Sequence, residues 1–169
     1  MTRLICSLLL SLLVAGCGYA LSDDTLKLPD GVARIYIKMF ENRTLEPYLE
    51  NVLTTHVTRR LQLLPDIELV EDAATADAVL SGRVIGYTVD SLAYDSQNLV
   101  VQYRATLRME ADLRRQSDGR ILWRGEMIRY QSFSSDPDLQ IQYDLERIAQ
   151  ELLAIRLAEE LSLKLTQTF

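Results

Sequence analysis

The sequence predicts an α+β fold, in which a mixed and mainly antiparallel sheet carries two helices on one face as a two-layer sandwich. Three observations predict this class. The segment Val100–Leu113 alternates apolar and polar residues with period two, as a strand buried on one face does. Two segments, Leu45–Leu64 and Leu139–Leu165, repeat apolar residues every three or four positions, as amphipathic helices do. The first helix separates two short strands, whereas turn signals join the later strands directly.

The first residues have the features of a signal peptide. Arg3 precedes the apolar run Leu4–Val14, which is too short to span a bilayer but has the length of a signal-peptide core. The following Val14-Ala15-Gly16-Cys17 resembles the bacterial lipobox, whose cysteine is lipidated and becomes the first residue of the mature protein. We therefore expect residues 1–16 to be removed and Cys17 to carry covalent diacylglycerol and an N-acyl chain such as palmitate.

Several acyl chains hold a protein on a bilayer where a single chain binds only reversibly. The sequence therefore predicts a lipid anchor on the periplasmic side of a membrane. Gly18 follows the cysteine, at a position where aspartate marks retention at the inner membrane, and so favours the outer membrane. Cleavage leaves 153 of the 169 residues with a net charge of −7. We expect residues 17–30 to form a tether and residues 31–169 to form a single domain.

The first half of the domain predicts a strand, a helix and a second strand. Arg34–Phe40 alternates as a strand does. Thr44 is the expected N-cap of the helix Leu45–Leu64, and Pro47 fits its first turn. Ile67–Val70 is the expected second strand, and the helical crossover predicts that it runs parallel to the first.

The second half predicts three longer strands and the terminal helix. Ala78–Val89 is apolar on both faces, which indicates a central strand. A polar hairpin at residues 90–99 leads into Val100–Leu113, and an Asp-Gly turn then leads into the strand Ile121–Phe133. Because both helices cover one face of the sheet, the polar residues of the long strand face either water or a partner.

The composition excludes several classes of function. The chain has 48% hydrophobic and 25% charged residues, which is too apolar for disorder, and its net charge of −6 argues against nucleic-acid binding. One histidine and two cysteines, of which Cys6 is lost with the signal peptide, leave no material for a zinc module or a disulfide. His56 is expected to be a helix-flank residue. No phosphate loop or nucleophile motif occurs, so the sequence predicts no catalytic residue, no metal and no enzyme.

The basic residues of the sheet region are all arginines. Residues 76–133 contain eight arginines and seven acids, whereas the rest of the mature chain is strongly acidic. Such a set forms either a solvated face of cross-strand ion pairs or a surface that contacts an anion or a partner. Both interpretations remain open at this point.

Several motifs resemble those of LptE-type lipopolysaccharide-assembly lipoproteins. The resemblance covers nearly the whole mature chain and keeps the order of elements. The motifs are Cys17–Leu21, Leu28-Pro29, Phe40–Pro47 with Leu49-Glu50 and Leu53-Thr54, Ala76–Gly82, Tyr103–Leu113 and Asp118–Trp123. Asn42-Arg43-Thr44 and Ala76–Gly82 also resemble curli-secretion and penicillin-binding-protein-activator lipoproteins, so a regulator of a cell-envelope enzyme or secretion channel is the alternative.

The resemblance implies a function in lipopolysaccharide transport. Members of this family plug the large outer-membrane barrel LptD, assist its assembly and contact lipopolysaccharide on its way to the cell surface. The polar lumen of a wide barrel needs a polar filling, which an open sheet face supplies. Arg104, Arg108 and Arg129 are the candidate contacts to lipopolysaccharide phosphates. Apart from the lipid on Cys17, no cofactor is expected.

Overall fold

The folded domain begins earlier than the sequence predicts. A computed structural model describes residues 28–167, so the predicted signal peptide, Cys17, Gly18 and most of the predicted tether lie outside the described residues. Leu28 and Pro29 were assigned to the tether 17–30, but both are buried, and Pro29–Gly31 forms the 3-10 turn η1. The domain boundary at residue 31 is therefore wrong, because Leu28 packs into the hydrophobic core.

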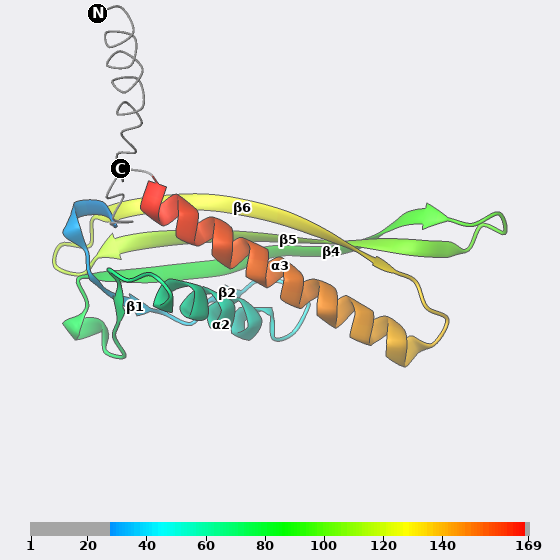
Figure 1. The fold of residues 1–169 in the computed structure, drawn as a ribbon, viewed down its shortest axis with the longest axis horizontal. Coiled ribbons are helices and arrows are strands. Elements are labelled where there is room, and N and C mark those ends of the chain that lie inside the picture. Colours follow the sequence, from blue (N-terminus) through cyan, green and yellow to red (C-terminus); the bar gives the residue numbers. More distant parts are fainter. Residues whose placement is uncertain (1–27, 168–169) are drawn as a thin grey trace, which may run out of the picture.

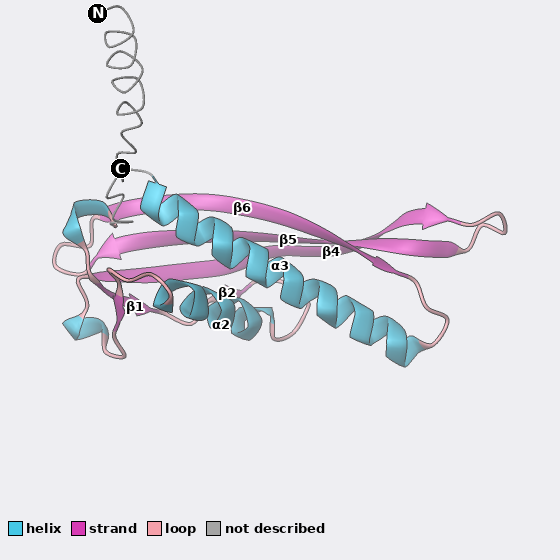
Figure 2. Ribbon diagram, in the orientation of Figure 1, coloured by secondary structure: helices cyan, strands magenta, loops and turns pink. Residues whose placement is uncertain are grey.

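The described residues form one mixed sheet. Its strand order is β3-β1-β4-β5-β6, and β2 pairs separately with β4. The strands are β1 (Arg34–Ile37), β2 (Glu41–Asn42), β3 (Glu68–Leu69), β4 (Ala78–Tyr94), β5 (Val100–Arg115) and β6 (Ile121–Ser134). β1 pairs in parallel with β3 and β4, whereas β4, β5 and β6 are antiparallel (Figure 2). The predicted parallel strand pair and the central position of β4 are both confirmed.

Two helices cover one face of this sheet. α2 (Leu49–Gln62) and α3 (Leu139–Gln167) lie side by side on the same side of the strands (Figure 1). This arrangement confirms the predicted α+β two-layer class. Within residues 28–167, no helix combines the length and the apolar character that a membrane crossing requires.

The connection between the first strand and α2 differs from the prediction. The strand ends at Ile37, β2 follows as a separate short strand, and α2 begins at Leu49 rather than Leu45. Thr44 is not the N-cap, because Tyr48 directly precedes the helix. The N–H (3.0 Å) and hydroxyl (2.8 Å) of Thr44 instead both donate to Oδ1 of Asn42. The Asn42 amide nitrogen donates in turn to the backbone oxygen of Glu46 at 2.7 Å. Pro47 also disfavours helical backbone at Glu46, so the helix starts only after it.

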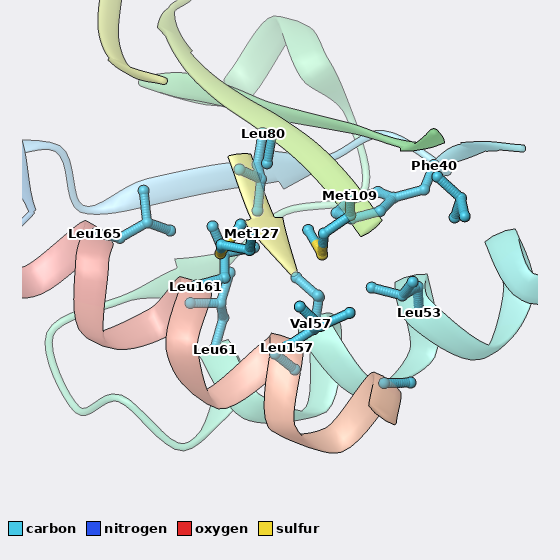
Figure 3. Packing of buried hydrophobic residues seen from close by; sticks show 14 of the residues in the cluster. Phe40, Leu53, Val57, Leu61, Leu80, Met109, Met127, Leu157, Leu161 and Leu165 are labelled. Carbon is cyan, nitrogen blue, oxygen red and sulfur yellow. The ribbon is translucent and has the colours of Figure 1, made fainter. Parts of the chain in front are cut away.

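The hydrophobic core lies between the helices and the inner face of the sheet. β5 contributes every second residue to it, and α2 contributes every fourth, as the two periodicities require. Figure 3 shows leucine and methionine side chains from both layers meeting in the core. The buried apolar residues of these two elements are Ala105, Leu107, Met109, Ala111 and Leu113 of β5, and Leu49, Leu53, Val57 and Leu61 of α2.

Three small residues form a row across the inner face. The strand register places Gly82 beside Ala111, and Ala111 beside Gly125. The Phe40 ring lies against Gly82, and the Trp123 ring lies against Gly125. The row therefore leaves the space that the two aromatic rings occupy.

The β4–β5 hairpin is longer than predicted. β4 continues to Tyr94 rather than ending at Val89, and the turn occupies only residues 95–99. Figure 1 shows this hairpin projecting beyond both helices. The alternation of apolar and polar residues weakens here because no helix covers either face, so the sequence pattern does not mark the end of the strand.

Asp77 joins the beginnings of β1 and β4. Its Oδ2 accepts hydrogen bonds from the backbone N–H groups of Ala33 (3.2 Å) and Arg34 (2.8 Å), and its Oδ1 accepts one from the Arg34 guanidinium at 2.8 Å. These bonds, above all those from Arg34, lower the pKa of Asp77 from 3.8 to about 2. The carboxylate is therefore the favoured form of Asp77 in the folded protein.

This lowered pKa predicts a pH-dependent contribution to stability. Asp77 stabilises the fold above about pH 4, and the contribution disappears as the pH falls through about 2. We expect Asp77→Asn to lower the free energy of unfolding near neutral pH by about 1 kcal/mol, because the ion pair is open to water. Urea unfolding of both proteins at neutral and at acidic pH measures this difference, which should shrink below pH 4. A difference that stays constant down to about pH 2 would contradict the assignment.

Candidate functional site on the open face of the sheet

The face of the sheet opposite the helices carries most of the charged residues of the long strands. Residues that pair directly in antiparallel strands lie on the same face, so the register assigns each side chain to one side. Asp112 pairs with Ser81 and Arg124, and it belongs to the face opposite Leu113. The charged residues of this open face are Arg83, Asp90, Arg104, Arg108, Glu110, Asp112, Arg114, Arg124 and Glu126.

Asp112 is the centre of an ion-pair network on this face. Its carboxylate is only 6% exposed and lies 2.6 Å from Nε of Arg114 and 3.9 Å from a terminal nitrogen of Arg83. Arg83 also lies 3.6 Å from Glu110. A buried carboxylate needs such partners, because an unpaired charge is expensive to bury. These pairs support the interpretation of cross-strand ion pairs for this part of the face.

One arginine in this region has no such partner. The ion-pair network borders a hollow of about 470 Å³, which is lined by Arg83, Glu110, Asp112, Arg124 and Glu126 among others. Arg124 is exposed and forms no ion pair with any residue between 28 and 167. The hollow therefore presents one unpaired guanidinium, that of Arg124, beside a lining in which three carboxylates outnumber two arginines.

Two of the three predicted contact residues lie on this face. Arg108 is about half exposed, and its Nε lies 3.4 Å from Glu126. The Arg104 guanidinium lies over the ring of Tyr130, 5.2 Å from its centroid. Both arginines reach solvent and can meet a ligand that approaches the open face.

Arg129 does not lie on this face. It pairs with Leu107 in the register, and its guanidinium lies 2.8 Å from Glu160 of α3, on the helix side. Glu160 also contacts Lys164 at 3.1 Å. Arg129 therefore shares no surface with Arg104 and Arg108, and contact of the three arginines with lipopolysaccharide stays a prediction. Strand parity would have revealed this, since Arg129 is an even number of residues from the buried Trp123 and Met127.

The histidine has a structural position. His56 of α2 lies half-buried against Glu151 of α3, so it joins the two helices as a helix-flank residue does. No group of three or more residues suited to hold a metal ion occurs within the described part of the chain. The sequence did not single out Arg83 and Arg124, although Arg124 lies an odd number of residues from the buried Trp123 and Met127 and so on the other face of its strand.

Solved structures share this fold. The chain is similar to a protein from Xanthomonas campestris (TM-score 0.58, 15% identity, 83% of this chain and 89% of that one). It is also similar to lipoprotein B from Nitrosomonas europaea (TM-score 0.56, 13% identity, 88% and 90%) and to a protein described as a lipoprotein from Caulobacter crescentus (0.55, 13%, 76% and 89%). At these identities the likeness shows the fold alone. A search of curated proteins gives no match.

The chain therefore has a two-layer α+β fold that it shares with solved bacterial proteins, two of which are described as lipoproteins. Within this class, the family model for lipopolysaccharide assembly matches residues 32–165, which is most of the chain. The chain belongs to the LptE family, which is described as a lipopolysaccharide-assembly family. The predicted resemblance is thereby confirmed.

Proposed function

We propose that this chain is a lipoprotein of the outer membrane that plugs the LptD barrel, assists its assembly and helps deliver lipopolysaccharide to the cell surface. The observation that carries the proposal is the family match over residues 32–165. In this proposal the lipid on Cys17 anchors the protein on the periplasmic side, and the chain catalyses no reaction.

The open face of the sheet supports a position inside a barrel. The lumen of a wide barrel is polar, and charged side chains that face it are not transferred into lipid. Acidic side chains pair with the arginines of this face. In the proposed complex, the contact between this face and the barrel wall therefore consists of ion pairs and water and not of apolar side chains. Arg104, Arg108 and Arg124 are the arginines that we propose for phosphate groups of lipopolysaccharide, since all three reach solvent.

Co-purification tests the proposal. We expect the tagged full-length protein, extracted in mild detergent, to carry a large β-barrel with it and to fractionate with outer membranes. Cys17→Ser should remove the protein from the outer-membrane fraction, because the acyl chains are what anchor the mature protein there. Recovery of a peptidoglycan synthase or a secretion channel in place of the barrel would overturn the proposal and favour the regulatory alternative.

A further inference from the structure

A second hollow lies on the helix side of the molecule, far from the open face. It has a volume of about 340 Å³ and lies between the segment that precedes α2 and the first half of α3. Three carboxylates and two aromatic rings line it, with an aliphatic side chain beside them. These residues are Glu46, Glu146, Glu151, Tyr48, Tyr143 and Val52.

The three carboxylates are held in place by hydrogen bonds that use one oxygen each. Gln150 donates to Oε1 of Glu46 at 2.9 Å, and the Tyr87 hydroxyl donates to Oε1 of Glu146 at 2.8 Å. Glu151 contacts His56 through Oε2. No residue between 28 and 167 bonds the second oxygen of any of the three. The cleft therefore offers preorganised acceptors that are free for a ligand.

Burial of Tyr87 supports this arrangement. Its hydroxyl lies between Glu146 and Gln150, and burial raises the pKa of the phenol well above its usual value. The hydroxyl consequently stays protonated and remains the donor that fixes Glu146. Arg147 also borders the cleft, but it is paired with Asp144 at 3.2 Å.

The aromatic rings select for a positive charge. Tyr48 is 70% exposed and Tyr143 is 66% exposed, and both line the cleft. The face of a tyrosine ring attracts ammonium and guanidinium groups, which carboxylates also bind. A guanidinium or ammonium group on an aliphatic stem therefore matches the carboxylates and the tyrosine rings of the lining.

The surroundings of the cleft indicate that this group belongs to a protein. Leu45, next to the lining residue Glu46, is fully exposed, and Leu139, one helical turn before the lining residue Tyr143, is 71% exposed. Exposed apolar residues beside a polar pocket are typical of a docking surface. A small free cation would leave all of these side chains in water.

The charge of this region complements a basic partner. The segments 41–52 and 134–151, which enclose the cleft, contain eight acids and only two bases. The acids are Glu41, Glu46, Glu50, Asp136, Asp138, Asp144, Glu146 and Glu151, and the bases are Arg43 and Arg147. Such a surface attracts a basic partner during encounter and repels an acidic one.

We propose that this cleft receives an arginine or lysine side chain of a protein partner, whose neighbouring apolar residues pack on Leu45 and Leu139. The carboxylates bind the charged head, and the tyrosine rings enclose it. This site does not depend on the barrel-plugging function, since it requires only a partner segment with one basic residue between apolar ones.

A peptide titration tests the proposal. The probe is acetyl-Leu-Arg-Leu-amide, and its control carries citrulline, which has the shape of arginine without the charge. We expect the full-length lipoprotein in detergent to show saturable NMR shifts at Tyr48 and Tyr143 with the arginine peptide. The citrulline peptide should bind roughly ten-fold more weakly, because it lacks the charge-assisted hydrogen bonds. Equal binding of both peptides overturns the proposal, as does spermidine binding as tightly as the arginine peptide.

Matched variants separate the cleft from general charge effects. Glu46→Gln with Glu146→Gln removes two charges but keeps the acceptor oxygens that Gln150 and Tyr87 use. This double variant should weaken peptide binding about ten-fold, whereas Glu110→Gln with Glu126→Gln on the open face should leave it unchanged. Tyr143→Ala, at an exposed position, should weaken it about three-fold without affecting folding. An equal loss in both double variants, or no effect of Tyr143→Ala, overturns the assignment.

Discussion

Gly82→Val is expected to destabilise the fold by about 3 kcal/mol, the largest loss among the changes considered for this chain. A Cβ atom at residue 82 would lie well under 3.0 Å from three carbons of the Phe40 ring. The ring cannot easily move away, because it is only 2% exposed and its backbone N–H donates to Thr54 of α2 at 3.0 Å. Valine favours strands over glycine, but that preference is worth at most about 1 kcal/mol and the clash therefore dominates.

Urea unfolding and thermal melting measure this loss, which corresponds to a fall of roughly 10 °C in Tm. Gly86→Val is the matched control in the same strand, since its Cβ would meet nothing nearer than Arg108 Cβ at 3.7 Å. This control should stay within about 0.5 kcal/mol of the wild type. In a double-mutant cycle, Phe40→Ala should relieve most of the cost of Gly82→Val. Additive losses in that cycle would show that the ring contact is not the cause.

Periodicity predicted the parts of the fold in which one face of an element is buried. β5 was predicted because Tyr103–Leu113 alternates without interruption. The predicted first residues of β5, Val100, and of α3, Leu139, are both confirmed. The parallel pairing of β1 with β3 followed from the helical crossover alone. In these elements the hydrophobic effect sets the pattern, so the sequence displays it directly.

Side-chain hydrogen bonds determined the parts that the sequence did not predict. The late start of α2 depends on the amide of Asn42, which bonds Thr44 and the backbone of Glu46, and no periodic pattern records such bonds. The acidic cleft was also unpredictable, because it brings Glu46 next to Gln150, 104 residues further along the chain. Long-range contacts of this kind follow from how the helices pack on the sheet, which depends on the whole core.

Arg129→Met is expected to lower the free energy of unfolding by about 1–2 kcal/mol, because it removes one partner of the largely buried Glu160. The carboxylate is 16% exposed and would keep only Lys164. Methionine preserves the apolar stem of the side chain, so the loss reports the ion pair rather than a cavity. Arg104→Met and Arg108→Met remove the same charge from the open face, where we expect stability to change by less than about 0.5 kcal/mol.

The same variants should rank in the opposite order when their affinity for lipopolysaccharide is measured. The double variant Arg104→Met with Arg108→Met should weaken binding to immobilised lipopolysaccharide by about ten-fold, since each lost arginine–phosphate contact is charge-assisted. Arg129→Met should leave this affinity unchanged at temperatures where the variant is folded. The variants thus differ in their effects on the free energy of unfolding and on lipopolysaccharide affinity, although each substitution removes one positive charge. If Arg129→Met weakened lipopolysaccharide binding without loss of stability, the side chain would have to leave Glu160 to reach the ligand, and its structural assignment would be wrong.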